Sequence, residues 1–439
     1  MEIFPIGGLG EVGKNMTAIG FGDKYVIVDM GLRLDKIMGF EDSNVGQMTR
    51  EELINIDGIA DDSALNKKNV VAILFTHGHL DHIGAVGKMA SQYDAPIYGT
   101  PFTVGLIRDV LKDEKVFKVT NPIRAVEPGG EVDLGGIRAE FINITHSILQ
   151  TSAVAVKGPD GIVLCASDFR LDETPLLGPA TDRNRLTELS KEGPVTAMVG
   201  AVRLDHEGPT KSEAHAREML KESLDEAMTS GKNVIVTTFS SHMVRLKSIV
   251  DLAYELGRTP IMLGRSLRKY TDTALSLGIV EFPEDMEIHG RPKSVANAMK
   301  KVQKSPKDYV MIVTGHQGEP NSILTRIVDD KLPFRIGKHD EVIFSASIIP
   351  NPLNEANRHL LETKLEVQGA NITRDIHVSG HAGRVDTLDF LKMVNPEYII
   401  PCHATTEKLE MLRDLGKQAG CLEENIHVME NGARVHIGA

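Results

Sequence analysis

The sequence has no tryptophan, and its 7 tyrosines and 13 phenylalanines are few for 439 residues. So few aromatic side chains argue against a protein that holds nucleic-acid strands by stacking alone. The three cysteines, Cys165, Cys402 and Cys421, are an odd number without CxxC spacing, which argues against a disulfide framework and a structural zinc ribbon. We therefore expect a reducing compartment.

A net positive charge and long apolar runs are also missing. The formal net charge is −12, which excludes a uniformly basic surface for nucleic acid, so any polyanion site must be a local concentration of Lys and Arg. The start, MEIFPIGGLGEVG, has no basic segment before an apolar one, and no run approaches about 18 apolar residues. We expect a cytoplasmic protein that does not enter a membrane.

The chain changes character along its length. About 170 residues at the start consist of short β segments such as KYVIVDM and VVAILFT, with one clear helical pattern, IGAVGKMASQY. From about residue 205, strands alternate with helices, as in NVIVTTF followed by HMVRLKSIVDLAYELG. This alternation predicts βαβ units on a parallel sheet, and hence an α/β protein.

The glycines near the start match a nucleotide-binding pattern. Gly8, Gly10 and Gly13 satisfy GxGxxG after an apolar strand. The following residues predict a β-hairpin that turns at Gly22 and Asp23, so no helix N-terminus would face a pyrophosphate. We expect a tight glycine loop beside an active site instead.

Four side chains that can bind metal lie within six residues, directly after the strand VVAILFT. His77 and His79 share a side because residues i and i+2 of an extended chain point the same way. Asp81 and His82 stand at the start of the following helix and diverge toward a second position. Two adjacent cations need such a divided ligand set, with one bridging carboxylate.

Three more residues with side chains that can bind metal follow strands elsewhere in the chain. His146 follows AEFINIT, Asp168 follows GIVLCAS and His403 follows YIIPC. Taken alone, each such residue is more often a hydrogen-bonded residue of the core or rim than a metal ligand. Together with the first four they predict a dinuclear site at strand ends, where functional groups collect.

The motifs THGHLDHIGA, THS, ASDFRLD and SGHA…PCHA resemble those of the metallo-β-lactamase superfamily, and the last pair resembles its β-CASP branch. The blocks FPIGGLGEVGKNMT, TGHQGEP and FSASIIPNPLNEANR are similar to the ribonuclease J family, in particular its shorter archaeal type. This resemblance covers residues 3–436. It implies an αββα sandwich made of residues 1–204 and 373–439, with a β-CASP domain on a mainly parallel sheet inserted at residues 205–372.

The resemblance also implies two divalent metal ions per chain, with zinc expected and manganese or magnesium as alternatives. Asp168 would bridge the two ions. The other ligands would be His77, His79 and His146 for one ion and Asp81, His82 and His403 for the other.

Further roles come from the same resemblance. Asp29 matches a structural acid near the site, and His381, with Ser379 beside it, matches a phosphate-contacting general acid. Asp81 and His381 would be the catalytic residues. His403 occupies a position where RNA-processing members of the branch have His, whereas DNA-processing members tend to have Val, so RNA is the favoured substrate.

This chain departs from the family pattern at Gly200, which stands where ribonuclease J usually has an acid. The partner expected to orient His381 is therefore missing, or is supplied by Asp205 or Glu207. The chain also ends without the extra C-terminal domain of longer bacterial relatives, so we expect no dimerisation through such a domain.

Basic residues cluster in the alternating region. The segment 291–307 and the residues around 258–269 contain no acid, and each is either part of an RNA track or only a solvated helix face. The predicted track consists of Arg265, Arg268, Lys300, Lys301 and Lys304.

We therefore expect an RNA-hydrolysing enzyme with its active site in the cleft between the two domains. The activity implied is a 5′-to-3′ exoribonuclease that prefers 5′-monophosphate ends, with endonucleolytic cleavage as a second activity. Single-stranded RNA is the expected partner. The sequence is compatible with a homodimer, and it does not identify partners in an RNA-degradation complex. The rivals are a superfamily hydrolase of small esters or lactams, and an RNA-binding or complex-forming protein with weak or no catalysis.

Overall fold

The computed structural model describes residues 1–37 and 45–438, which form two compact units. The first unit consists of Met1–Glu173, Gly178–Thr210 and the chain from Gly380 onward. The second consists of Thr174–Leu177 and Lys211–Ser379. None of the helices in the described part of the chain is both long enough and apolar enough to cross a membrane.

Two sheets form the centre of the first unit. Among the described residues, one sheet has the strand order β21-β1-β3-β4-β5-β6-β7 and the other β19-β12-β11-β10-β9-β8. The first sheet is made of β1 (Glu2–Gly7), β3 (Met16–Phe21), β4 (Lys24–Val28), β5 (Val70–Leu74), β6 (Ile97–Gly99), β7 (Ile123–Ala125) and β21 (Val435–His436). The second is made of β8 (Glu131–Asp133), β9 (Arg138–Asn143), β10 (Ser152–Gly158), β11 (Gly161–Ala166), β12 (Val195–Gly200) and β19 (Tyr398–Cys402).

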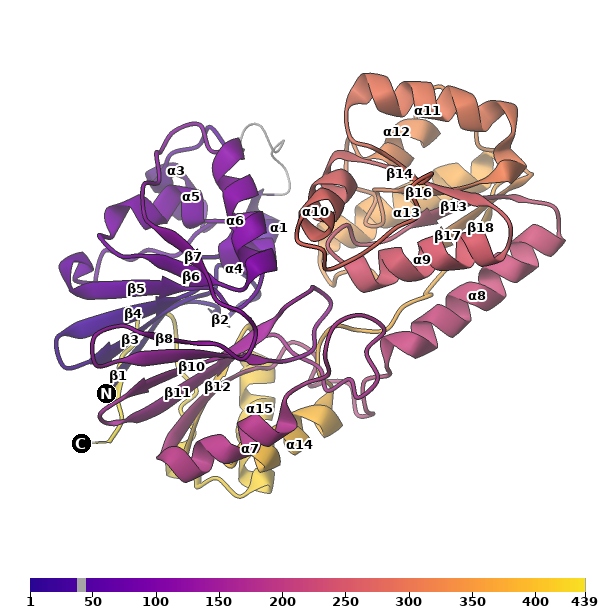
Figure 1. Ribbon diagram of the computed structural model, residues 1–439. Helices are drawn as coiled ribbons and strands as arrows, with labels where there is room; N and C mark the ends of the chain where they lie inside the picture. Colours follow the sequence, from indigo (N-terminus) through magenta and orange to yellow (C-terminus); the bar gives the residue numbers. More distant parts are fainter. Residues whose placement is uncertain (38–44, 439) are drawn as a thin grey trace. The chain divides into compact units, whose positions relative to one another are not determined.

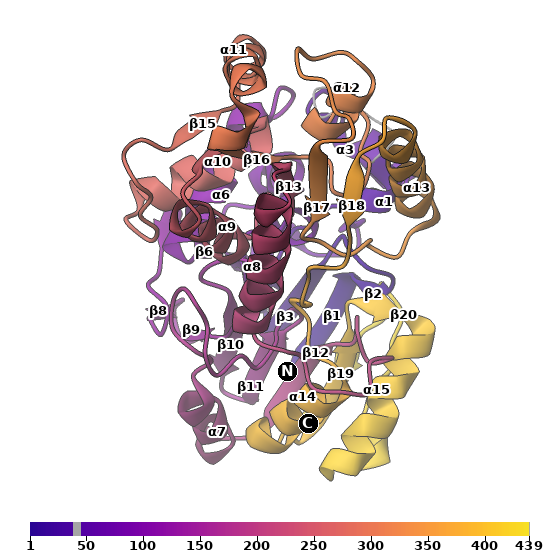
Figure 2. The ribbon, with the colours of Figure 1, turned by 90° about the vertical axis from the view of Figure 1, so that its right-hand side faces the viewer.

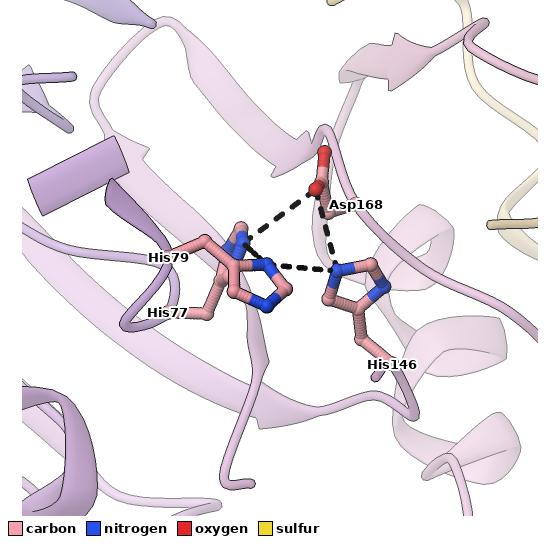
Figure 3. Close-up of side chains that lie close together, drawn as sticks. All are labelled: His77, His79, His146 and Asp168. Atoms are coloured by element: carbon pink, nitrogen blue, oxygen red, sulfur yellow. Dashed lines mark hydrogen bonds and ion pairs between the residues drawn. The ribbon is translucent and has the colours of Figure 1, made fainter. Parts of the chain in front are cut away.

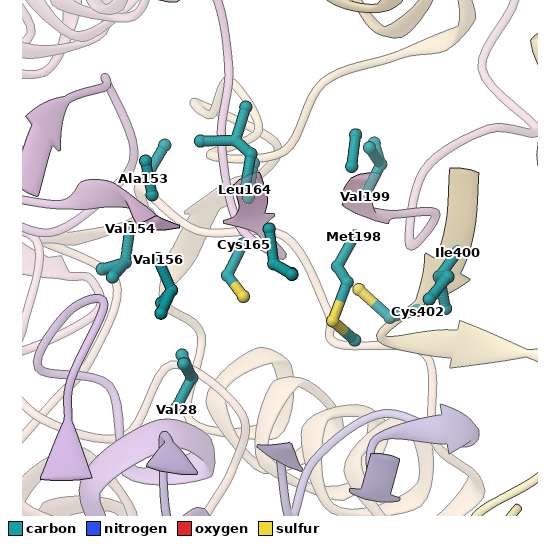
Figure 4. Close-up of a cluster of buried hydrophobic side chains, with 14 of the residues drawn as sticks. Val28, Ala153, Val154, Val156, Leu164, Cys165, Met198, Val199, Ile400 and Cys402 are labelled. Atoms are coloured by element: carbon teal, nitrogen blue, oxygen red, sulfur yellow. The ribbon is translucent and has the colours of Figure 1, made fainter. Parts of the chain in front are cut away.

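The core of this unit lies between the two sheets. Figure 4 shows Val28 of β4 on one side and the sulfur-bearing side chains of β11, β12 and β19 on the other. Cys165 and Cys402 are both buried there as free thiols. Strands such as β11 are buried along their whole length, which explains their continuous apolar sequences.

Helices cover the outer faces of both sheets, which completes the predicted αββα sandwich (Figure 1). The first sheet carries α1 (Leu34–Ile37), α3 (Arg50–Asn55), α4 (Leu80–Ile83), α5 (Val86–Met89) and α6 (Pro101–Asp113). The second carries α7 (Arg183–Glu192), α14 (Arg384–Val394) and α15 (Thr406–Ala419). Single 3₁₀ turns lie at η1 (Lys67–Asn69), η2 (Ala90–Gln92) and η4 (Glu423–Asn425).

The helix predicted after β5 is broken into α4, α5 and η2. The Ala85 N–H donates to the carbonyl of Met30 at 2.9 Å rather than to the Asp81 carbonyl, which a continuous helix would require. The Asp81 carbonyl accepts from the backbone N–H of Asn15 at 3.1 Å instead. Helix α6, which begins at Pro101, was not predicted from the sequence.

The glycine segment forms no nucleotide-binding turn. After the short strand β2 (Leu9–Gly10) the chain continues into the antiparallel pair β3 and β4, as predicted. Strand β2 pairs with β20 (Ala404–Thr405) from the far end of the sequence. The glycine loop therefore lies beside the segment that carries His403.

The second unit contains one parallel sheet with the order β15-β14-β16-β13-β17-β18, as its strand and helix alternation predicted. Helices of this unit lie on both faces of the sheet (Figure 2). Its strands are β13 (Asn233–Thr237), β14 (Thr259–Leu263), β15 (Glu287–His289), β16 (Tyr309–Val313), β17 (Asp340–Phe344) and β18 (Asn371–Thr373). Its helices are α8 (Glu213–Thr229), α9 (Met243–Glu255), α10 (Arg265–Ser276), α11 (Pro292–Lys304), η3 (Pro306–Asp308), α12 (Ile323–Val328) and α13 (Pro352–Val367).

Candidate metal centre

The loop after β5 brings the first predicted ligands together. His77 is fully buried in this loop, and His79 is the N-cap residue of α4. Helix α4 then places Asp81 and His82 within its single turn. The remaining predicted ligands, His146, Asp168 and His403, follow β9, β11 and β19 and are buried.

Three imidazoles form the first ligand group. The Nδ1 of His79 lies 3.2 Å from the Nε2 of His77 and 3.2 Å from the Nε2 of His146. Asp168 Oδ2 faces the same point, at 3.5 Å from His77 Nε2 and 3.4 Å from His146 Nε2 (Figure 3). Ligands about 2.0 Å from a tetrahedral ion lie roughly 3.3 Å apart, so these four atoms have the spacing of one metal site.

The second ligand group forms around the other oxygen of the same carboxylate. Asp168 Oδ1 lies 3.3 Å from His403 Nε2 and 3.7 Å from His82 Nε2. Asp81 Oδ2 lies 3.5 Å from His403 Nε2 and 3.8 Å from His82 Nε2. The ligand atoms within each group all lie within 4.8 Å of one another.

The chemistry of this donor set fits two divalent cations. Asp168 Oδ1 is buried, and it accepts no hydrogen bond from any residue that the structure describes. A buried carboxylate oxygen without a donor is costly unless a cation satisfies it. The two oxygens of Asp168 point to different groups, which is the arrangement that a bridging ligand needs.

Contacts on the far side of the rings orient the imidazoles. The Nδ1 of His82 lies 2.8 Å from Asp29 Oδ2, and Asp29 also accepts hydrogen bonds from the backbone and hydroxyl of Thr76. The Thr76 hydroxyl lies 3.0 Å from the Nδ1 of His77. The Nδ1 of His146 donates to the Gly380 carbonyl at 2.7 Å. Such partners fix which ring nitrogen keeps its lone pair for a metal.

Burial keeps the first group neutral. It lowers the pKa of His79 to about 3, holds the pKa of His146 well below its usual range, and, together with nearby His82, lowers the pKa of His77. An imidazole must be unprotonated to bind a metal ion. The first group is therefore ready to bind at neutral pH.

Nearby carboxylates raise the pKa of His82 in the second group. Burial alone would lower the pKa of His82, but the carboxylates of Asp29, Asp81 and Asp168 outweigh it and raise this pKa to about 10. Burial would raise the pKa of Asp168, but His403, His381 and His82 hold it well below its usual range. Asp168 is therefore ionised.

His381 lies against both groups. Its ring centre is 5.0 Å from that of His146 and 6.1 Å from that of His403. Burial lowers the pKa of His381 despite the nearby carboxylate of Asp168. The Thr210 hydroxyl donates to the His381 carbonyl at 3.1 Å, which holds its backbone.

The departure at Gly200 has a structural counterpart. The place that a Cβ would take at Gly200 is occupied by the carbonyl of Ser167, so this backbone accommodates no acidic side chain there. The Asp205 carboxylate pairs with the Lys408 ammonium at 3.0 Å. The carboxylates that raise the pKa of His381 are those of the proposed ligands Asp168 and Asp81.

The remaining predicted site residues belong to the second unit. Ser379 is its last residue. Lys301 pairs with Glu287, and Arg268 lies 3.0 Å from Asp272, so neither is a free cation. All five residues of the predicted RNA track are exposed: Arg265, Arg268, Lys300, Lys301 and Lys304.

Sequence reasoning named Asp29 near the site but missed the other residues that orient the ligands. Thr76 precedes His77, but nothing in its spacing indicates that its hydroxyl would join Asp29 to a ligand. The Gly380 carbonyl carries no sequence signal, because every residue has one. Asn15 also contacts His403, and only the adjacent glycines drew attention to its loop.

Family models cover nearly all of the chain. Residues 9–225 match the metallo-β-lactamase superfamily, and residues 231–362 match the β-CASP domain of ribonuclease J. Residues 369–429 match the RNA specificity domain of Zn-dependent metallo-hydrolases. The predicted fold class, a metallo-β-lactamase domain combined with a β-CASP domain, is thereby confirmed.

Whole-chain comparisons agree with these models. The chain is 41% identical to Ribonuclease J of Methanocaldococcus jannaschii, with 98% of both chains covered. It is also 41% identical to Ribonuclease J of Pyrococcus abyssi, covering all of this chain and 97% of the relative. A crystal structure of a protein of unknown function from Enterococcus faecalis shares the fold, with a TM-score of 0.65, 15% identity and 99% of both chains covered. This chain belongs to the ribonuclease J family.

Proposed function

We propose that this chain is a metal-dependent ribonuclease that hydrolyses the phosphodiester bonds of single-stranded RNA. Its main activity would be 5′-to-3′ exonucleolytic, with a preference for 5′-monophosphate ends and with endonucleolytic cleavage as a second activity. The observation that carries the proposal is the Asp168 carboxylate, whose two oxygens face two separate ligand groups. The names of the relatives supply the substrate class.

The seven proposed ligands hold two ions, with zinc expected. When bound, such ions supply a water of lowered pKa and neutralise the charge that develops on the phosphate. His77, His79 and His146 contribute neutral ring nitrogens, because burial depresses their pKa values. Asp81 and Asp168 contribute the negative charge that pairs with the cations.

His381 is the proposed phosphate contact beside the metal site, together with Ser379. Its lowered pKa leaves the ring neutral at pH 7, so the ring can donate an N–H to a phosphate oxygen. A neutral imidazole is a poor source of a proton for the leaving oxygen. We therefore assign His381 mainly to binding and orienting the phosphate.

A second candidate is an RNA-binding or complex-forming protein with weak or no catalysis. The observation that favours it is the backbone at Gly200, which has no room for the acid that ribonuclease J usually carries there. An esterase or lactamase is disfavoured, because the matches to the β-CASP and RNA specificity domains extend over residues 231–429.

One experiment separates these candidates. RNA labelled at the 5′ end, carrying either a monophosphate or a triphosphate, is incubated with the full chain, with and without a chelator, beside DNA of the same sequence. The proposal predicts release of the labelled mononucleotide, faster from monophosphate ends and from RNA, and its loss with chelator. Binding of RNA without turnover supports the second candidate, and equal rates on RNA and DNA contradict the RNA assignment.

A further inference from the structure

The glycine loop reaches the ligands of the second group. Gly8 has a φ of +91°, and a Cβ there would collide with the side-chain oxygen of Asn15, so only glycine suits this position. The Gly8 carbonyl accepts the backbone N–H of His403 at 2.6 Å. This contact holds His403 in a left-handed conformation, with a φ of +52°.

Asn15 is buried at the end of this loop, with 7% of its surface exposed. Its side-chain N–H₂ donates to the Asp81 carbonyl at 3.0 Å, and its backbone N–H donates to the same oxygen at 3.1 Å. Its side-chain oxygen lies 2.9 Å from the Nδ1 of His403. Asn15 thus joins the segments that carry Asp81 and His403.

These contacts determine the tautomer of His403. A carbonyl can only accept a hydrogen bond, so the amide atom that faces the Asp81 carbonyl must be the nitrogen. The other amide atom is then the oxygen, which requires His403 Nδ1 to carry a hydrogen and to donate it. In the neutral ring the lone pair then lies on Nε2, and it is this atom that faces Asp168 and Asp81.

We propose that Asn15 is a positioning residue for the second ion: its amide fixes the tautomer and direction of His403 and the backbone of Asp81. The inference rests on the two-metal site of the proposed function. The outer nitrogens of His77 and His146 contact Thr76 and the Gly380 carbonyl instead. Loss of the Asn15 amide should therefore weaken one metal position and spare the other.

The test is metal binding by the full chain, measured by titration of metal-depleted protein with Zn²⁺ and, for spectra of each site, with Co²⁺. Asn15→Leu removes the amide at similar size, and Asn15→Asp restores an acceptor for the Nδ1 hydrogen of His403. The matched control is Asn431→Leu. Asn431 holds the same loop through Leu9 and Glu11 without contacting a proposed ligand.

We expect the wild-type chain to bind two ions. Asn15→Leu should keep the first ion at normal affinity and bind the second about 10- to 100-fold more weakly, the usual cost of losing a partner of a metal ligand. Asn15→Asp should recover part of this loss, and Asn431→Leu should bind both ions normally. A ¹⁵N spectrum of the zinc-loaded wild type should show the hydrogen of His403 on Nδ1.

Several results would overturn the inference. They are normal binding of both ions by Asn15→Leu, an equal loss in Asn431→Leu, and a hydrogen on Nε2 of His403. If Asn15→Leu does not fold, Asn15→Asp and the spectrum of the wild type still decide. Fewer than two ions bound by the wild-type chain would contradict the proposed function itself, before any variant is compared.

Discussion

The two ligand groups share Asp168 but differ in the pKa shifts of their histidines and in the parts of the chain that build them. Burial keeps His77, His79 and His146 neutral, whereas three carboxylates raise the pKa of His82 to about 10. The first group draws its ligands from residues 77–168. The second is completed by His403 and is held by the loop near the N-terminus.

In the proposed two-metal site, one carboxylate would serve two metal positions that respond differently to pH and to mutation. The first position is preorganised, because its three imidazoles need lose no proton. At the second, a proton on His82 competes with the ion, since a protonated imidazole is no ligand. Measurements of metal affinity and of RNA turnover should therefore distinguish the two positions.

The largest effect is expected at the shared carboxylate. Asp168→Asn removes the negative charge that both groups use, so the affinities for both ions and the turnover of RNA should fall together. We expect turnover to drop by about 10³-fold, the scale of a lost electrostatic contact in an active site. Titration with Zn²⁺ and assays on labelled RNA measure both quantities, and loss of only one ion would contradict bridging by Asp168.

Variants in one ligand group should weaken the binding of one ion more than that of the other. His79→Ala should weaken the first ion, whereas Asp81→Ala or His82→Ala should weaken the second, and each should lower turnover at least about 100-fold. Thermal unfolding of these variants should remain cooperative, because none of the three side chains belongs to the apolar core between the sheets. An Asp81→Ala variant that turns over RNA normally would remove Asp81 from the catalytic residues.

The affinities for the two metal ions should differ in their dependence on pH. Since the pKa of His82 is raised to about 10, the second ion competes with a proton at every lower pH. Its affinity should rise about tenfold for each pH unit between pH 7 and 9. The first ion should show no such slope there, because burial lowers the pKa of its imidazoles below the range tested. Calorimetry in buffers of different ionisation enthalpy measures the proton released, and equal slopes for both ions would contradict this account.

The smallest effect is expected outside both groups, in the second unit. Lys300 and Lys304 are exposed on α11, whereas Lys301 already pairs with Glu287. If two lysines contact phosphate, Lys300→Ala with Lys304→Ala should flatten the salt dependence of RNA affinity by about 1.4 log units per log unit of salt. Lys301→Ala is the control with a smaller expected change. An unchanged slope would identify these lysines of α11 as a solvated helix face. Metal binding should stay normal in all of these variants.

Much of the fold and of the ligand set could be predicted from the sequence. The alternation after residue 205 predicted β13, α9, β14 and α10, because a buried parallel sheet leaves continuous apolar strands. The spacing of His77, His79, Asp81 and His82 predicted the divided ligand set. Short-range patterns of this kind depend only on local geometry.

The contacts that hold the ligands could not be predicted in this way. Asn15 and His403 are 388 residues apart, and their segments are brought together by the pairing of β2 with β20 and by the bond from His403 to Gly8. The break between α4 and α5 arises because Asn15 occupies the Asp81 carbonyl, which is a tertiary effect without a local signal. Neither helical periodicity nor turn propensity reports such bonds.

The most direct test of a two-metal site is RNA turnover measured while metal-depleted protein is titrated with Zn²⁺, with bound metal determined at each point. A two-metal site predicts that turnover stays near zero while the first ion binds and rises as the second position fills, to a maximum at two ions per chain. Full turnover with one ion or fewer per chain would contradict a two-metal ribonuclease built around Asp168.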